Sequence, residues 1–594
     1  MRRALLVLAL ISCSIFPSAP SAQQPANDAV RISTKSELVM VPVLVTSKDG
    51  KHMAGLKKDD FTITENGKPQ KVAVLEEIET ASGTFGRNVG PGEFSNAYTG
   101  DAQNRVTILV VDMVNTPFMD QSYAREQLLK YLASQVDDVE PTALMVLTKQ
   151  GVRTIHHFTS QPKVLAAALR KVTGEMTEAD KSLSQPVADE NNRFVVPAPE
   201  GSLVGGDTIE NIIGRLVVFA RSGDLELDEM RRREDLVNTL NSFQHIAQSL
   251  AGVPGRKSMI WITGGFPFEL GPSGTVAGLT HWSMGEGLRD SVLPTQSSGR
   301  NQAEINQGIV MGVATELSKA MRPVYDRTMQ VLASANIAVY PVDARGLITY
   351  FGGTEAHSRY AALRQFSIRE EQHRAAINTM ENFAAATGGR AFYNRNDLVN
   401  AFHEAADDSR TYYHLGYYRD KKDAKPGWRK LEVKVGKPDV RVRARKGFLL
   451  TETTMVASNS RQLDLTSAVQ SPLDYTGIPL RVRWLGTAPG EGKTKVGFAV
   501  VTGGGSVTVD ADNNNKLDLD VVAVAMKASG EAADQVGQTI GGNVDQAAIT
   551  DLQTNGLTYE NMFEVPPGTY TAKFVVRDNV TGRMGSVQAA LKVD

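Results

Sequence analysis

Residues Val106 to Val111 form a continuous run, apolar except for Thr107, that ends in Asp112. A strand that is apolar on both faces is typical of the centre of a parallel sheet covered by helices on both sides. Similar short runs recur between amphipathic helical patterns until about residue 400, and the turn Lys149-Gln150-Gly151 joins two of them as a hairpin. This alternation predicts that residues 104–400 fold as a doubly wound, mostly parallel α/β sheet with an antiparallel edge.

Hydrophobic periodicity places the elements of this α/β domain. A long helix is expected where one apolar stripe runs through Leu236, Leu240, Phe243, Ala247 and Leu250. A later helix is expected to stop at Thr387-Gly388-Gly389, because glycine adopts the left-handed cap. The other expected elements are strands at 143–147, 152–158, 258–263, 337–342 and 390–393, and helices at about 119–136, 162–172, 313–335, 370–387 and 397–408. Polar or glycine-rich insertions are expected at 173–223 and 266–310.

Strand patterns flank the α/β domain on both sides. A β-branched run and the hairpin signal Glu65-Asn66-Gly67 predict a small β unit over 32–79. Strands return at 410–450, and over 460–594 only strand signals remain, which predict a C-terminal Ig-like β-sandwich. Residues 80–103 have the composition of a linker. We expect 32–79 and 410–450 to pack together as one β-sandwich, because the two ends of an inserted domain leave from adjacent points.

The N-terminus has the pattern of an export signal. Met1-Arg2-Arg3 is a positive n-region, an apolar stretch too short to span a bilayer follows, and small residues end at Ala22. We therefore expect a signal peptide over 1–22 and an exported protein that is periplasmic, secreted or at the cell surface. Cys13, the only cysteine, closes a lipobox-like string, so a lipid anchor at Cys13 and an outer-membrane lipoprotein remain an alternative to a soluble product. No later segment is long and apolar enough for a transmembrane span.

Charge and motif content narrow the class of function. The 594 residues carry 64 basic and 66 acidic side chains, so no broad field points to nucleic acid or to a membrane surface. The sequence contains neither a G-x-S-x-G elbow nor a phosphate-binding G-x-x-x-x-G-K loop. His403-Glu404 lacks the second histidine of a zinc-protease helix. We expect a non-catalytic protein with no catalytic residues.

Several stretches resemble a known family. The segment Leu109 to Thr116 is similar to the first strand and metal-site loop of von Willebrand factor A (VWA) domains. Taken in order, the set of matching stretches resembles the VWFA-related proteins found in acidobacteria. The further matching stretches are Glu65-Asn66-Gly67-Lys68-Pro69, Pro254-Gly255-Arg256-Lys257-Ser258, Tyr340-Pro341-Val342-Asp343-Ala344-Arg345-Gly346, Tyr413-His414-Leu415-Gly416-Tyr417-Tyr418 and Arg443-Ala444-Arg445-Lys446-Gly447-Phe448. The resemblance implies a VWA-like fold more than it implies a function.

The resemblance also implies a divalent-cation site at the carboxyl ends of the strands. VWA domains hold Mg²⁺ with an Asp-x-Ser-x-Ser loop, and the matching residues are Asp112, Val114 and Thr116, with Thr239 as a second-loop hydroxyl. Val114 removes one oxygen donor, and Gly264 and Gly265 stand where active domains carry an aspartate. The metal-ion-dependent adhesion site is therefore degenerate. Two interpretations stay open: a weak site for Mg²⁺ or another divalent cation at Asp112, Thr116 and Thr239, or an Asp112 that only caps the loop.

Strand ends at a switch point form a binding crevice even without a metal. We therefore expect the ligand-binding crest to consist of Asp112, Asn115, Thr116, Gly264 and Gly265. The function that we expect is adhesion-type binding of a protein or glycan ligand. The alternative is a structural or assembly scaffold of the cell envelope with a metal-free VWA domain.

Overall fold

The computed structural model describes residues 36–79, 89–90, 92–98, 105–135, 140–172, 234–265, 269–270, 276–277, 321, 323–347, 359–420, 427–450, 461–490 and 492–593. The predicted signal peptide, Cys13 and the insertion 173–223 lie outside this part of the chain. Of the insertion 266–310, the structure describes only β10 (Glu269–Leu270) and β11 (Val276–Ala277), which pair antiparallel. No helix in the described ranges is long and apolar enough to cross a membrane.

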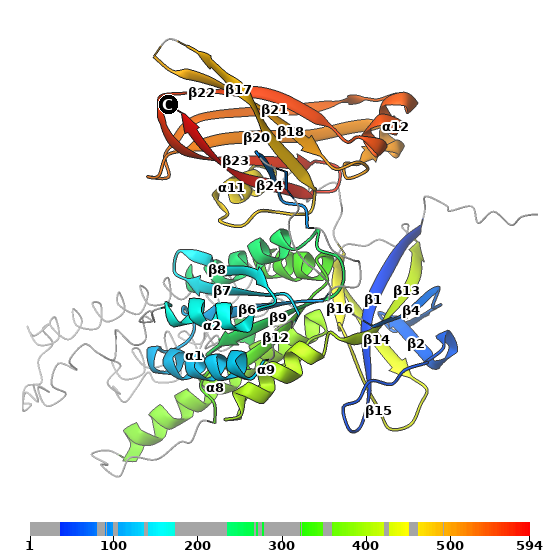
Figure 1. Ribbon diagram of the computed structural model, residues 1–594. Helices are drawn as coiled ribbons and strands as arrows, with labels where there is room; N and C mark the ends of the chain where they lie inside the picture. The colour runs from blue at the N-terminus through cyan, green and yellow to red at the C-terminus, as the bar shows by residue number, and fades with distance from the viewer. Residues whose placement is uncertain are drawn as a thin grey trace, which may run out of the picture.

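A five-stranded sheet lies at the centre of the chain, in the order β12-β9-β6-β7-β8 (Figure 1). Neighbouring strands are parallel except at the edge pair β7 and β8, so the predicted antiparallel edge is present. The predicted strand 390–393 is reduced to one bridge between Phe392 and Val342. The strand bounds are β6 (Val106–Asp112), β7 (Thr142–Thr148), β8 (Gly151–Thr159), β9 (Lys257–Thr263) and β12 (Ile337–Asp343).

Helices cover both faces of this sheet, because its central strands are apolar on both sides (Figure 1). Ile108 and Val110 face a layer made by the helices at 234–249 and 323–334 and by the end of α8 (Arg359–Thr387). Leu109 and Val111 face the opposite layer, which consists of α1 (Phe118–Ser134), α2 (Pro162–Arg170) and α9 (Leu398–Asp407). The predicted apolar stripe of helix 234–249 is buried in the first of these layers.

The two strand-rich segments that flank the α/β domain form one unit, as expected from the sequence. Its two sheets have the orders β15-β1-β13-β4 and β16-β14-β2-β3, so each sheet mixes strands from both segments. Val41, Ile63, Tyr413 and Leu431 belong to their common core. The strands are β1 (Ser36–Ser47), β2 (Phe61–Glu65), β3 (Lys68–Gln70), β4 (Val74–Glu79), β13 (Thr411–Asp420), β14 (Gly427–Val435), β15 (Val440–Ala444) and β16 (Gly447–Leu450), with a short 3-10 helix η1 (Lys58–Asp60) before β2.

The C-terminal domain consists of two sheets with a shared core, in which Val482 and Phe498 of one sheet meet Phe574 and Val587 of the other. The sheet orders are β22-β18-β17-β5 and β19-β20-β23-β24, and β21 also pairs with β20. The strands are β17 (Leu480–Pro489), β18 (Thr494–Thr502), β19 (Val509–Asp510), β20 (Lys516–Met526), β21 (Ala532–Asn543), β22 (Thr558–Val565), β23 (Gly568–Asp578) and β24 (Met584–Val593).

The prediction that residues 460–594 hold only strands is wrong. This part also contains the helices α11 (Arg461–Gln470) and α12 (Gln546–Thr554) and the 3-10 helix η3 (Ala511–Asn513). Helix α12 has a recognisable start, since the Asp545 carboxylate accepts a hydrogen bond from the backbone N–H of Ala548 at 2.8 Å. Helix α11 lies between the sandwich and the α/β body (Figure 1).

The interpretation of residues 80–103 as a linker is also wrong in part. Residues Glu93–Ser95 form β5, which pairs antiparallel with β17 of the C-terminal domain. The buried Asn96 side chain continues the contact: its amide donates to the carbonyls of Tyr475 and Ile478, and its oxygen accepts from the backbone N–H of Leu480. A segment that precedes the α/β domain is thus part of the last domain in the chain.

Candidate functional site

The sheet has a topological switch point between β6 and β9. The chain runs from β6 outward through β7 and β8, and then crosses to the other side of β6 to form β9 and β12. In open α/β sheets, ligands bind beyond the carboxyl ends of the strands at such a point. Asp112 ends β6, and Thr263 ends β9, directly before Gly264 and Gly265.

The structure brings the sequence-predicted crest residues together. The Asn115 side-chain amide donates to the Asp112 carboxylate at 2.9 Å and to the Thr239 hydroxyl at 3.0 Å. The backbone N–H of Gly264 donates to the Thr116 hydroxyl at 2.9 Å. A side chain at Gly264 would not fit, because its Cβ would lie 2.6 Å from the Asn115 carbonyl oxygen. The loop after β6 and the loop after β9 therefore touch through these residues.

The Asp112 carboxylate is completely buried and accepts five hydrogen bonds. The donors are the backbone N–H groups of Val114 (3.0 Å) and Asn115 (2.9 Å) on one oxygen, and on the other the Asn115 side chain (2.9 Å), the Trp261 indole N–H (3.0 Å) and the Thr263 hydroxyl (2.8 Å). Burial raises the pKa of Asp112, and these hydrogen bonds oppose the rise. Asp112 is the centre of a hydrogen-bond network that ties β6 to β9.

The residues around Asp112 do not fit the divalent cation that the VWA resemblance implies. Mg²⁺ requires six oxygen ligands at close distance, but the Asp112 oxygens already face donors, including an indole N–H that is no metal ligand. The Thr239 hydroxyl is also engaged, because it donates to the Asp235 carbonyl at 2.8 Å and accepts from Asn115. Within the described residues, no group of three or more His, Cys, Asp or Glu side chains could hold a metal ion.

An apolar rim borders the crest. We define the rim as Phe118 and Met119, at the start of α1, and Leu347, which follows β12; their exposed fractions are 38%, 78% and 51%. Asn396 links the two sides, since its side-chain oxygen accepts from the backbone N–H of Leu347 and its carbonyl accepts from the Tyr123 hydroxyl of α1. These two hydrogen bonds therefore hold the start of α1 and the segment after β12 together beneath the rim.

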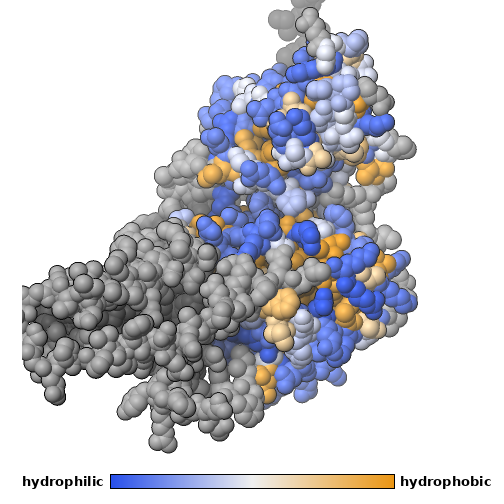
Figure 2. Space-filling view, turned by 90° about the vertical axis from the view of Figure 1, so that its left-hand side faces the viewer, coloured by the Kyte–Doolittle hydropathy of each residue, from blue (hydrophilic) through white to orange (hydrophobic). Residues whose placement is uncertain are grey.

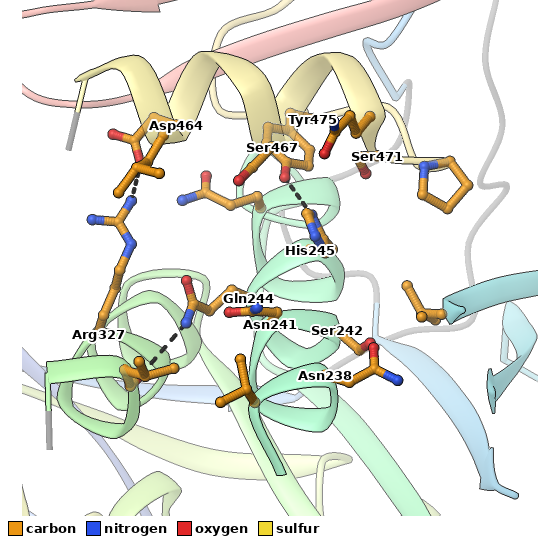
Figure 3. A pocket seen from close by; sticks show the side chains of 18 of the residues that line it. Asn238, Asn241, Ser242, Gln244, His245, Arg327, Asp464, Ser467, Ser471 and Tyr475 are labelled. Atoms are coloured by element: carbon orange, nitrogen blue, oxygen red, sulfur yellow. Dashed lines mark hydrogen bonds and ion pairs between the residues drawn. The ribbon is translucent and has the colours of Figure 1, made fainter. Parts of the chain in front are cut away.

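A second candidate site, which sequence reasoning missed, is an interdomain cleft of about 580 Å³ (Figure 3). Its walls are helix 234–249, helix 323–334, α11 with the loop that follows it, the turn into β8 at 150–152, and Met584 of β24. Figure 2 shows hydrophilic and hydrophobic residues mixed along the waist between the C-terminal domain and the α/β body. Side chains with amide or hydroxyl groups line much of the cleft: Asn238, Asn241, Ser242, Gln248, Ser467 and Gln470.

The charged groups of the cleft are paired. Asp464 of α11 forms ion pairs with Arg327 of helix 323–334 and with the fully buried Arg577 of β23, the latter at 3.0 Å. His245 faces the hydroxyl of Tyr475 at 2.5 Å, and burial lowers the pKa of His245 to about 4, so the ring is neutral at pH 7. Apart from the paired Arg327 and Asp464, the side chains described as lining the cleft are neutral hydrogen-bonding or apolar groups.

No protein-family model matches this chain, and no curated protein matches it. The crest and the interdomain cleft are therefore interpreted from their own geometry. The crest residues were singled out by the sequence, but the hydrogen bonds that Trp261 and Thr263 donate to Asp112 were not predicted. The cleft combines residues from segments more than 200 positions apart, such as His245 and Tyr475.

Proposed function

We propose that this chain is an exported, non-catalytic binding protein whose central domain is VWA-like and holds a protein ligand at the crest without a divalent cation. Export is supported by the leader pattern of residues 1–22. The observation that carries the binding proposal is the exposed apolar rim of Phe118, Met119 and Leu347 beside the switch point. Aromatic residues and methionine are enriched in the buried cores of protein interfaces.

The hydrogen-bond network around Asp112 supports this proposal in a second way. A binding surface that is already ordered loses less conformational entropy when the ligand arrives. The five hydrogen bonds of Asp112 fix the loop from which α1, and with it Phe118 and Met119, begins. The same network favours binding without a metal, because its hydrogen bonds occupy the Asp112 carboxylate that a cation would need.

The alternative is a structural or assembly scaffold of the cell envelope. The observation that favours it is the interlocking of domains: β5 joins the C-terminal sandwich from the N-terminal half of the chain, and Asp464 bridges arginines of two domains. In a scaffold, contacts would be made by the β domains and the crest would carry none. The exposed apolar residues Leu485 and Met562 of the sandwich mark where such contacts are expected.

Site-specific photocrosslinking of the full chain in the producing cells separates the two proposals. A photoreactive residue at Met119 is expected to give a discrete protein adduct, and the same residue at Met562 is expected to give none. The adduct is expected to persist in EDTA and to fall about tenfold when Leu347→Glu is added, whereas the matched change Leu485→Glu leaves it intact. A charge in the centre of an apolar contact costs about 1–3 kcal/mol or more.

The outcomes are distinct. An adduct from Met562 alone would favour the scaffold. An adduct from Met119 that disappears in EDTA would restore the metal-dependent interpretation of Asp112. No adduct from Met119 in cells that contain the folded protein would refute binding at the crest.

A further inference from the structure

We propose that the interdomain cleft is a binding site for a neutral oligosaccharide. This site is separate from the crest, and the proposal does not depend on the crest having a ligand. The cleft volume of about 580 Å³ lies within the range of small-molecule sites, about 300–1,000 Å³.

The cleft offers hydrogen-bonding groups that have no partner in the described part of the chain. The Ser242 hydroxyl is buried and makes no hydrogen bond. The side chains of Asn241, Gln248, Ser467 and Gln470 also line the cleft without a described side-chain partner. In Figure 3, Ser467 extends from α11 toward helix 234–249, on which Asn241 and Ser242 lie. A ligand placed between the two helices would therefore meet polar groups on more than one side.

These side chains suit a ligand with many hydroxyl groups. Serine, asparagine and glutamine each donate and accept hydrogen bonds, as a sugar hydroxyl does. The Ser242 hydroxyl is already buried without a partner, so a sugar hydroxyl that reaches it would relieve a penalty of about 1–3 kcal/mol, which an apolar ligand cannot do. Apolar side chains such as Val237, Val324 and Pro472 lie between the polar ones and can contact the C–H faces of a sugar ring.

The charge of the cleft argues against an ionic ligand. Arg327 and Asp464, the charged side chains described as lining the cleft, already pair with each other, and Asp464 also pairs with the buried Arg577. His245 remains neutral because burial lowers its pKa to about 4.

The backbone of the cleft argues against an extended peptide. Peptides in extended form are usually held by the free N–H and C=O groups of a strand edge. Most of the cleft wall is helical, and the backbone groups of a helix are already hydrogen-bonded within the helix. The edge strand β8 contributes only Gly151 and Val152, at its first two positions.

The test is binding of cellobiose, maltose and N,N′-diacetylchitobiose to the full chain, measured by saturation-transfer NMR and calorimetry. At least one neutral disaccharide is expected to bind, and Ser242→Ala and Asn241→Ala are each expected to weaken that binding about fivefold, as for the loss of one hydrogen bond. The matched control is Ser334→Ala, because Ser334 lies on helix 323–334 outside the cleft and is expected to leave binding unchanged.

Thermal unfolding separates a ligand-binding role of Ser242 from a structural one. The Ser242 hydroxyl has no partner to lose, so the Ser242→Ala protein is expected to unfold at the wild-type temperature or slightly above it while it binds the sugar more weakly. A structural role would instead lower the unfolding temperature. The proposal is overturned if no neutral disaccharide binds up to about 10 mM, or if binding is insensitive to Ser242→Ala and Asn241→Ala. Tighter binding of triglycine or of a glucuronate disaccharide in the same cleft would also overturn it, in favour of a peptide or an anion.

Discussion

Replacement of Asp112 by asparagine distinguishes a hydrogen-bond centre from a metal ligand. The change keeps the size of the side chain and removes its negative charge. In a cation site without its metal, loss of a buried charge is expected to leave the protein equally stable or more stable. In the network seen here, all five partners of the Asp112 carboxylate are donors. The NH₂ group of asparagine would therefore face other donors.

The size of the expected stability loss follows from the hydrogen bonds that Asp112→Asn would break. Turned one way, the new NH₂ group faces the backbone N–H groups of Val114 and Asn115; turned the other way, it faces the Trp261 indole and the Asn115 side chain. Either orientation leaves two buried N–H groups without an acceptor, at about 1–3 kcal/mol each. Relief of the buried charge offsets part of this loss, so we expect Asp112→Asn to lower the free energy of unfolding by about 3 kcal/mol.

The assay is thermal unfolding of the full chain in EDTA, followed by calorimetry. The transition that contains the α/β domain is expected to fall by about 6–12 °C, at about 2–4 °C per kcal/mol for a domain of this size. Asp59→Asn is the matched control, because Asp59 is exposed in η1 and the same chemical change there is expected to be neutral. An Asp112→Asn protein at least as stable as the wild type in EDTA, and less stable than it in Mg²⁺, would refute the reasoning.

Two further predictions concern the interdomain cleft. Asp464→Ala is expected to destabilise the protein by about 3–5 kcal/mol, because Arg577 is fully buried and would lose its carboxylate; calorimetry should show a much smaller change for the exposed Asp551→Ala, and equal changes would contradict the ion-pair argument. His245 has a pKa of about 4 in the folded protein and about 6.5 when unfolded, so the unfolded state binds the extra proton and stability falls as the pH drops through this window. Between pH 7.5 and 5 the free energy of unfolding is expected to fall by about 2 kcal/mol. Urea titrations at the two pH values should show that His245→Asn removes this difference. An unchanged pH dependence in the variant would show that His245 is not the titrating group.

The strands and helices of the α/β domain could be predicted because each produces a hydrophobic pattern within a short stretch of sequence. The run from Val106 to Val111 and the stripe of helix 234–249 are visible within a few residues, and both are buried as expected. The position of Asp112 could be predicted for the same reason. Its partners could not, because Trp261 and Thr263 meet it only through the parallel register that sets Val110 beside Trp261.

The elements that sequence reasoning missed are short and owe their structure to distant partners. Helix α11 buries Ala468 and the charged Asp464, which carries no apolar signal and pairs with the distant Arg327 and Arg577. Strand β5 has three residues in a segment with the composition of a linker. By contrast, the Asp545 cap of α12 was a local signal that the strand-rich surroundings obscured.

The pairing of β5 with β17 has a consequence for biosynthesis. Ser95 and its partner Leu480 are 385 positions apart, so β5 leaves the ribosome long before the strand that it completes. Such a contact has a very high sequence separation and forms late in folding. Without β5, the β17 backbone over Arg481 to Arg483 would be an open strand edge, which is a template for pairing with another chain. The C-terminal domain made alone is therefore expected to associate edge to edge, and in the full chain three residues from the N-terminal half prevent it.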